Sequence, residues 1–170
     1  MWSGPLACHQ ARLAVMTDYR LRPAGPADAE ALLRIHWASM SEYLAEAFGG
    51  YTPEEARAQH GRWLEEGRAQ VIIVGGQVAG SVDIDWLPDS GVLVRIEIDP
   101  AFQGRGVGTA IVTDMQGQCA RRGIPARLRV FAHNPALNLY RRLGFRETDR
   151  DGPSIDMQWD PPSPSDPGRD

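Results

Sequence analysis

Hydrophobic and polar positions alternate along this chain with two different periods, which predicts a mixed α/β domain. Hydrophobic residues spaced by three and four predict helices over about residues 26–47, 53–66 and 106–122, with a shorter helix over 135–143. Short hydrophobic runs between them predict strands over 19–22, 71–74, 78–86, 92–98, 127–131, 146–150 and 155–159. We therefore expect a mixed, mostly antiparallel twisted sheet of about six to seven strands, with about four helices on both faces.

Residues with special backbone preferences mark the ends of these elements. Thr52 and Glu55 have the spacing of a capping box, which starts the second helix, and Gly67 ends it. Gly75 and Gly76 together indicate a tight hairpin between the second and third strands. The fourth strand, the helix after it and the fifth strand then form a crossover between parallel strands.

The composition changes at both ends of the chain, which predicts one domain with two additions. Residues 1–16 lack a clear strand or helix pattern and also the long hydrophobic run of a signal peptide, and translation could equally start at Met16. Residues 161–170 are almost wholly Pro, Ser, Asp, Gly and Arg, a composition that cannot bury enough surface to order itself. We expect an N-terminal extension over 1–16, a folded domain over 17–160 and a disordered tail over 161–170.

The sequence DPAFQGRGVGTAIV, residues 99–112, has the composition of a loop that binds phosphate groups. Gly104, Gly106 and Gly108 can bring the backbone close to a ligand, and the first N–H groups of the following helix have no partner within it. Arg105 and the helix dipole add positive potential, which favours a pyrophosphate over a neutral group. The loop lacks both the Gly-Lys-Ser/Thr ending of a P-loop and the third glycine of a dinucleotide fingerprint. A glycine-rich turn without a ligand is the alternative.

A second segment about thirty residues further on, FAHNPALNLYRRLGF, predicts a short helix. Asn134 precedes a proline that suits the first position of a helix, so Asn134 is expected to cap it and Gly144 to end it. Leu139 and Leu143 are four residues apart and are expected to face the core, whereas Tyr140 falls on a neighbouring face. From the spacing alone, Tyr140 is a packing residue rather than a chemical one.

Together, the two segments resemble the GNAT superfamily of acyl-CoA-dependent N-acetyltransferases. The run from Gln103 to Gly108 matches that family's Gln/Arg-x-x-Gly-x-Gly/Ala pyrophosphate loop, and the run from Asn134 through Tyr140 to Phe145 matches its second motif. Both motifs occur in the expected order and at about the expected distance, and the resemblance extends over about residues 19–159. The family's architecture is the same mixed sheet that the hydrophobic pattern predicts.

The resemblance implies that acetyl-CoA, as co-substrate, lies in a cleft between the fourth and fifth strands. The backbone of Ile96 and Ile98 would pair with the pantetheine arm and polarise the thioester carbonyl. Asn134 would contact the same arm, although capping a helix explains this residue equally well. The pyrophosphate would be held by the loop residues Gln103, Gly104, Arg105, Gly106, Val107, Gly108 and Thr109.

The resemblance also implies direct transfer of an acetyl group to a primary amine within a ternary complex. Tyr140 occupies the family's general-acid position, where a phenol would protonate the departing CoA thiolate. Glu97 is a candidate general base, and strand alternation places it with Arg95 and Asp99 on the face opposite the two isoleucines. A salt bridge to Arg95, or a solvated position, explains Glu97 as well. Many members of the family use water relays instead of a carboxylate base, so a relay is the alternative to Glu97.

Other polar candidates have structural explanations that we favour. Asp83 and Asp85 share one face of their strand and could attract a cationic acceptor, but a solvent-facing strand is the simpler explanation. Cys119 lies among hydrophobic residues of the crossover helix, where a buried structural thiol is expected rather than a nucleophile. A covalent intermediate is therefore not needed.

Composition and charge exclude several other classes of protein. The chain of 170 residues is 42% hydrophobic, has a net charge of −4 and lacks lysine, which is unlike the basic composition of nucleic-acid-binding proteins. The cysteines and histidines show no ligand spacing, which argues against a metal site. No hydrophobic run approaches the length of a membrane span. A cytoplasmic acyltransferase without metal, nucleic-acid or membrane partners is the expectation.

The acceptor and the oligomeric state stay open. Small amines, amino acids, antibiotics and peptide amines are all candidates, since the region that selects the acceptor in the family, residues 35–68 and the last strands, carries no readable motif. The chain could be a monomer or a homodimer. A non-catalytic acyl-CoA sensor and a nucleotide- or phosphate-binding domain are the alternatives from other classes. The phenol of Tyr140 argues against both, because neither needs it.

Overall fold

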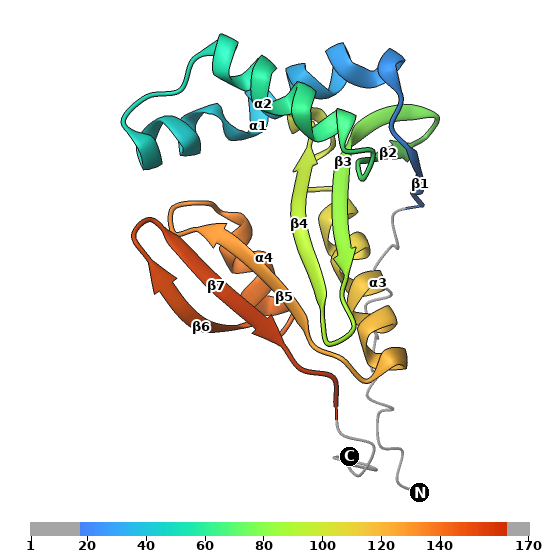
Figure 1. The fold of residues 1–170 in the computed structure, drawn as a ribbon. Coiled ribbons are helices and arrows are strands. Elements are labelled where there is room, and N and C mark those ends of the chain that lie inside the picture. The colour runs from blue at the N-terminus through green and yellow to red at the C-terminus, as the bar shows by residue number, and fades with distance from the viewer. Residues whose placement is uncertain (1–17, 163–170) are drawn as a thin grey trace, which may run out of the picture.

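The computed structural model describes residues 18–162, which form a seven-stranded sheet with helices on both of its faces (Figure 1). The elements are β1 (Arg20–Pro23), α1 (Ala29–Phe48), α2 (Pro53–Glu65), β2 (Gln70–Val74), β3 (Gln77–Trp86), β4 (Gly91–Ile98), α3 (Val107–Arg122), β5 (Ala126–Phe131), α4 (Ala136–Arg142), β6 (Arg146–Asp151) and β7 (Ser154–Trp159). Short 3₁₀ turns at Pro26–Asp28 and Pro100–Phe102 precede α1 and the glycine loop. The predicted N-terminal extension, Met16 included, and residues 163–170 of the predicted tail lie outside the described residues.

The strands lie in the order β1-β2-β3-β4-β5-β7-β6. Each neighbouring pair is antiparallel except β4 and β5, which are parallel and are connected through α3. The predicted fold class, a mixed and mostly antiparallel sheet, is confirmed. Every helix within residues 18–162 is too short or too polar to cross a lipid bilayer.

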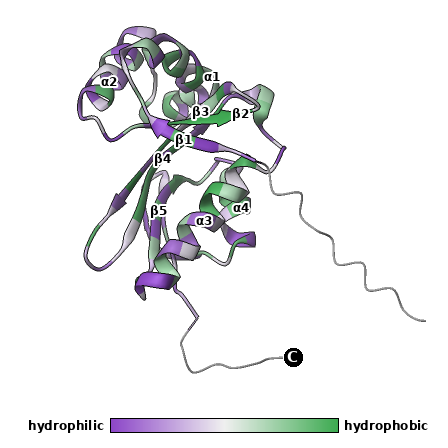
Figure 2. Cartoon of the chain, turned by 90° about the vertical axis from the view of Figure 1, so that its right-hand side faces the viewer, coloured by the Kyte–Doolittle hydropathy of each residue, from purple (hydrophilic) through white to green (hydrophobic). Residues whose placement is uncertain are grey.

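Successive residues of the inner strands face two different helical layers. Ile72 packs in the larger core together with α3 and α4, whereas its neighbour Val71 packs with Leu32 and Ile35 of α1. A strand buried on both faces must be hydrophobic at consecutive positions, which explains the run Val71-Ile72-Ile73. Strand β1 lies at the edge of the sheet and is hydrophilic, whereas β2 beside it is hydrophobic (Figure 2).

Local signals place the predicted boundaries well. The backbone N–H of Glu55 donates to Thr52 Oγ1 at 3.2 Å, and the Thr52 N–H donates to the Glu55 carboxylate at 2.8 Å, so the predicted capping box is confirmed. Gly75 and Gly76 form the two-residue turn between β2 and β3, with φ angles of 57° and 80°. These left-handed conformations are typical of a type I′ hairpin turn and favour glycine.

The two central strands diverge after a short parallel contact. β4 and β5 pair over only three residues, the last pair being Leu93 and Leu128, and then separate (Figure 1). Asp83 lies opposite Arg95 while Ile84 lies opposite Leu93, so Val94 forms a bulge in β4 where the strands begin to separate. A bulge of this kind bends one strand and redirects its side chains.

β4 remains tightly attached to β3 beyond the bulge. A Cβ atom at Gly80 would lie only 2.1 Å from the carbonyl oxygen of Glu97, so glycine allows the close approach of the two backbones there. The gap produced by the divergence therefore opens on the β5 side of β4.

The prediction for the buried face of α4 is wrong in one respect. Leu143 is half-buried and packs against the core as predicted, but Leu137 and Tyr140 are the buried residues of α4, and Leu139 is only half-buried. Tyr140 packs against Phe145 with an edge-to-face arrangement of the rings, their centroids 5.9 Å apart. Leu139 instead borders the gap between β4 and β5, where hydrophobic packing is incomplete.

Candidate active site

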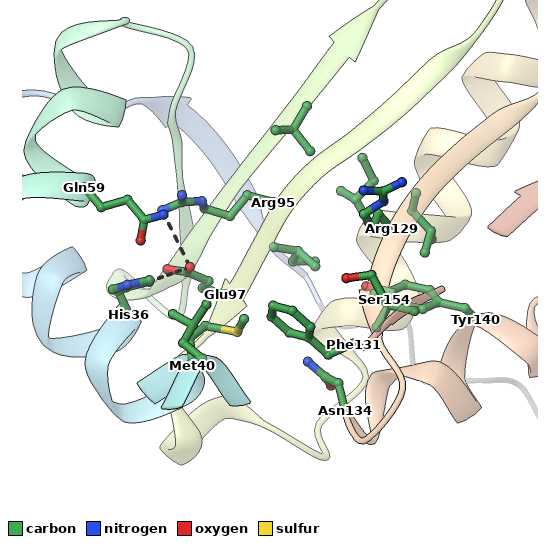
Figure 3. Close-up of a pocket in the computed structure, with 16 residues that line it drawn as sticks. His36, Met40, Gln59, Arg95, Glu97, Arg129, Phe131, Asn134, Tyr140 and Ser154 are labelled. Carbon is green, nitrogen blue, oxygen red and sulfur yellow. Dashed lines mark hydrogen bonds and ion pairs between the residues drawn. The ribbon is translucent and has the colours of Figure 1, made fainter. Parts of the chain in front are cut away.

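A groove occupies the gap between β4 and β5. It consists of two adjoining hollows of about 280 and 180 Å³. Both hollows are lined by Met40, Ile96, Glu97, Asn134 and Tyr140. The smaller hollow extends to the glycine loop at Gln103 and Gly108, and the larger one extends to His36 and Gln59 under α1 and α2. Figure 3 shows Arg95, Glu97 and His36 on one wall of the larger hollow, with Asn134 and Tyr140 on the other.

The glycine loop has the backbone of an anion site at one end of this groove. Gly104 and Gly106 take left-handed conformations, with φ angles of 71° and 85°, and α3 begins directly after Gly106 without a side-chain cap. The first N–H groups of α3, at Val107 and the two residues after it, therefore have no partner within the helix. The guanidinium of Arg105 lies over the ring of Phe102, 5.4 Å from its centroid.

Other predicted cofactor residues border the groove but already make internal contacts. The side-chain amide of Gln103 donates to the carbonyl oxygen of Ile98 at 2.9 Å, which attaches the loop to the end of β4. The N-cap of α4 is Pro135, one residue after the predicted Asn134, but Asn134 Oδ1 still accepts from the Ala136 N–H, the first of the helix, at 2.9 Å, and Asn134 borders both hollows. Ile96 is half-buried and lies beside the point where β4 and β5 diverge.

Tyr140 reaches the groove from α4 and is 5% exposed. Burial raises the pKa of its hydroxyl to about 12, because the phenolate would lose its hydration there. The phenol therefore keeps its proton throughout the physiological range. It can act as a hydrogen-bond donor inside the groove.

Glu97 is buried on the opposite wall, at 3% exposure, so the solvated position considered from sequence is wrong. Its Oε1 lies 2.8 Å from His36 Nδ1 and 3.7 Å from Arg95 Nη1. The considered salt bridge to Arg95 is thus present but long, and His36 is the nearer partner. Within residues 18–162, Glu97 Oε2 has no hydrogen-bond partner. A buried carboxylate oxygen without a donor is costly, and a bound amine would satisfy it.

The favoured solvent-facing interpretation of Asp83 is also wrong. Asp83 is 1% exposed and accepts a hydrogen bond from the indole N–H of Trp63 at 3.0 Å. Asp85 is half-buried and pairs with Arg68 at 2.8 Å. Trp63 of α2 covers Asp83, which strand alternation alone does not show. Both carboxylates are engaged by side chains of the protein and lie outside the groove lining.

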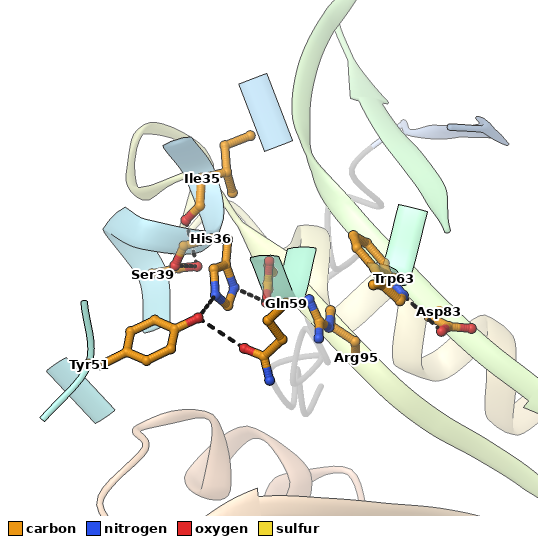
Figure 4. Close-up of polar contacts among 9 residues, drawn as sticks. Ile35, His36, Ser39, Tyr51, Gln59, Trp63, Asp83 and Arg95 are labelled. Carbon is orange, nitrogen blue, oxygen red and sulfur yellow. Dashed lines mark hydrogen bonds and ion pairs between the residues drawn. The ribbon is translucent and has the colours of Figure 1, made fainter. Parts of the chain in front are cut away.

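A chain of hydrogen bonds connects Glu97 to the surface between α1 and α2 (Figure 4). His36 Nε2 lies 2.7 Å from the hydroxyl of Tyr51, and this hydroxyl donates to Gln59 Oε1 at 2.9 Å. The ring of Trp37 stacks on that of Tyr51. Sequence reasoning missed these residues, although the spacing of His36 four residues after Leu32 places a polar ring on the buried face of α1.

His60 is a second buried histidine beside this chain. Its ring centroid lies 5.7 Å from that of His36 and 5.1 Å from that of Trp63, and its Nε2 lacks a hydrogen-bond partner within the described residues. Burial lowers the pKa of His60 to about 4, with a smaller opposing effect from the charge of Glu97. The ring is therefore neutral in the folded protein at pH 7.

His60 is expected to make the protein less stable in acid. Unfolding restores an ordinary pKa near 6.5, so stability is fully present above that pH and is lost as the pH falls toward 4. Between pH 7 and 5 the free energy of unfolding should fall by about 1–2 kcal/mol from this group. Urea unfolding at both pH values measures the change. His60→Phe should abolish this fall in stability, whereas His133→Gln, at an exposed histidine, should keep it. A fall in His60→Phe as large as that of the wild-type protein would contradict the prediction.

Residues 18–162 also contain possible metal ligands and a thiol. No group of three or more histidine, cysteine or acidic side chains lies close enough there to hold a metal ion. Cys119 is buried, and this burial raises the pKa of its thiol, so the predicted structural role fits. Cys8 lies outside the described residues.

Comparison of the sequence with protein families decides the identity of the domain. The model of the acetyltransferase (GNAT) family matches residues 30–145, more than half of the chain. The chain belongs to the GNAT acetyltransferase family. The resemblance inferred from the glycine loop and the second motif is thereby confirmed. GNAT membership indicates an acyltransferase that binds acyl-CoA.

Solved acetyltransferase structures share this fold at low sequence identity. The PaiA N-acetyltransferase of Thermoplasma acidophilum, crystallised with coenzyme A, is 17% identical with a TM-score of 0.62, over 84% of this chain and 99% of that one. An acetyltransferase from Thermus thermophilus is 24% identical with a TM-score of 0.64, over 84% and 96%. The ribosomal-protein-S18-alanine N-acetyltransferase of Escherichia coli is 21% identical with a TM-score of 0.59, over 89% and 99%. No curated protein sequence matches the chain.

Proposed function

We propose that this GNAT protein transfers an acetyl group from acetyl-CoA to a primary amine by direct attack in a ternary complex. The observation that carries the proposal is the continuous groove from the glycine loop to the buried pair Glu97 and Tyr140. One end has the backbone chemistry to bind a pyrophosphate. The other end has a carboxylate and a phenol, which are the groups that acyl transfer to an amine requires.

The glycine-loop end is suited to acetyl-CoA. The backbone N–H groups from Gly104 to Thr109 and the N-terminus of α3 would hold the pyrophosphate. The pantetheine arm would lie between the diverging strands, alongside Ile96, Ile98 and Asn134. Backbone groups of β4 beyond Leu93 no longer pair with β5, so groups on this edge are available to the arm and to the thioester carbonyl.

The two ionisable groups of the groove then have separate tasks. An amine attacks only when neutral, so Glu97 would take a proton from the acceptor on its free Oε2. Tyr140 would donate a hydrogen bond and then a proton to the departing CoA thiolate. The amine nitrogen forms the new bond to the acetyl carbon, and the carbon–sulfur bond breaks. The second proton that the nitrogen loses on becoming an amide would restore the phenol of Tyr140, and Glu97 would release its proton to solvent when the product leaves. Because the attack is direct, an acyl-enzyme is not formed, and Cys119 is buried away from the groove lining.

The experiment measures CoA release from acetyl-CoA against amines, amino acids, aminoglycosides and peptides, together with calorimetric binding of acetyl-CoA. Turnover with one class of acceptor would support the proposal and identify the acceptor. Binding of acetyl-CoA without turnover on any acceptor would favour the non-catalytic sensor. Displacement of acetyl-CoA by ATP or a dinucleotide at lower concentration than by CoA would favour a nucleotide-binding domain.

A further inference from the structure

The contacts of His36 indicate how Glu97 is kept ready to accept a proton. This inference rests on the proposed function. His36 is buried, and both of its ring nitrogens face polar partners: Glu97 Oε1 at 2.8 Å from Nδ1 and the Tyr51 hydroxyl at 2.7 Å from Nε2. Packing alone would be served by an apolar side chain. The positions of the hydrogens in this chain therefore decide what His36 does.

The outer end of the chain determines the proton on Nε2. Tyr51 has a single hydroxyl proton, which it donates to Gln59 Oε1 at 2.9 Å. The side of the hydroxyl oxygen that faces His36 then offers only lone pairs. Nε2 must carry a proton to make a hydrogen bond with it.

The inner end determines the proton on Nδ1. One proton must lie between Nδ1 and Glu97 Oε1 for their contact to be a hydrogen bond. Arg95 Nη1, 3.7 Å from the same oxygen, favours a carboxylate over a carboxylic acid. The proton therefore belongs to the nitrogen, and the ring is an imidazolium.

The groups that face His36 and Glu97 come from several elements. Arg95 approaches from β4, Tyr51 from the segment before α2, and Gln59 and His60 from α2. His60 is neutral at pH 7, since burial lowers its pKa to about 4, so it adds no second positive charge beside His36. Two cations, Arg95 and His36, thus converge on one oxygen of Glu97. The other oxygen, Oε2, is left without a partner among the described residues.

We propose that His36 is a positioning residue, a doubly donating imidazolium that keeps Glu97 ionised and leaves its Oε2 free for the acceptor amine. Tyr51 and Gln59 hold the ring in this protonation state from outside. His36 itself does not touch the reacting atoms. Its effect on the reaction passes through Glu97.

A matched pair of variants separates this role from packing. His36→Asn places an amide N–H near the position of Nδ1 and keeps a donor to Glu97, whereas His36→Leu fills the space without one. We expect His36→Leu to lower kcat/KM at pH 7 about 30-fold, with kcat falling more than KM changes, because Glu97 loses the donor that holds its Oε2 toward the acceptor. The acid-side midpoint of its pH profile should move to higher pH, because the carboxylate loses one of its two cationic neighbours. His36→Asn should retain most of the rate and show a smaller shift.

Two results would overturn the proposal on kinetic grounds. One is a fall in rate in His36→Leu with an unmoved acid-side midpoint, which would indicate packing alone. The other is equal loss in His36→Asn and His36→Leu, since only one of them lacks the donor. Thermal unfolding of both variants checks that each is folded at the assay temperature.

Nitrogen-15 NMR of the histidine rings tests the same proposal without an activity assay. At pH 7, both ring nitrogens of His36 should show protonated shifts, while His60 provides a neutral ring for reference. Glu97→Gln and Tyr51→Phe should each return His36 to a neutral ring. A neutral His36 in the wild-type protein would overturn the proposal. If no amine is acetylated, the proposed function fails, yet these spectra still decide the state of His36.

Discussion

Glu97→Gln is expected to lower kcat/KM for acetyl transfer at pH 7 by about 100-fold to 1000-fold, the usual contribution of a general base. Glutamine has nearly the same shape and can still accept a hydrogen bond from His36 through its amide oxygen. It cannot take a proton from an ammonium. The variant must therefore rely on the small fraction of acceptor that is already neutral in solution.

Because Glu97→Gln depends on acceptor that is already neutral, its rate should have a characteristic pH profile. The rate of Glu97→Gln should rise about tenfold per pH unit up to the pKa of the acceptor amine, because the neutral fraction rises in that proportion. The wild-type rate should vary much less over the same range. Initial rates of CoA release from pH 6 to 10 measure both profiles with one acceptor.

A control variant and a binding measurement complete the test. Asp85→Asn removes a carboxylate that pairs with Arg68 outside the groove lining, so its rate should stay within about twofold of wild type. Acetyl-CoA affinity of Glu97→Gln should also be unchanged, because the side chain faces α1 rather than the glycine loop. A rate within threefold of wild type at pH 7 would mean that Glu97 is not the base.

Features set by neighbouring residues could be predicted from the sequence. The capping box of Thr52 and Glu55 and the Gly75-Gly76 turn depend on contacts within four residues, and both are present. The alternation that places Glu97 opposite Ile96 depends only on the period of a strand. The glycine loop could be predicted for the same reason, since the role proposed for it depends on consecutive backbone groups.

Features set by distant elements could not be predicted. His36 and Glu97 are 61 residues apart and meet only because α1 packs on β4. Asp83 appeared solvent-facing because nothing in β3 itself shows that Trp63 of α2 covers it. The bulge at Val94 is equally hidden, because it depends on the pairing of β4 with β3 and not on a glycine or proline in the strand.

The buried face of α4 could not be predicted either, although its residues lie close together in the sequence. Spacing of four favours Leu139 and Leu143 as core residues, but Leu137 and Tyr140, three apart, satisfy helical spacing as well. Which pair is buried depends on where the gap between β4 and β5 lies. The gap leaves Leu139 half-buried and brings the phenol of Tyr140 to the groove.

Tyr140→Phe is expected to lower kcat about 100-fold while leaving the affinity for acetyl-CoA within about twofold. Phenylalanine keeps the packing against Phe145 and removes only the hydroxyl. The CoA thiolate would then leave without a proton donor beside the buried side chain of Tyr140, where an anion is poorly solvated. Burial raises the basicity of that thiolate as well as the pKa of Tyr140, so the proton transfer between them stays feasible.

The raised pKa of Tyr140 also predicts how the wild-type kcat depends on pH. An ordinary tyrosine would lose its proton near pH 10, but a pKa of about 12 keeps this phenol a donor beyond that pH, so wild-type kcat should show no fall near pH 10 from this group. Tyr43→Phe is the matched control, because Tyr43 also lines the smaller hollow, and its kcat should stay close to wild type. An alkaline fall near pH 10 that disappears in Tyr140→Phe would contradict the raised pKa. A kcat near that of wild type in Tyr140→Phe would remove Tyr140 as the acid and leave thiolate protonation to solvent.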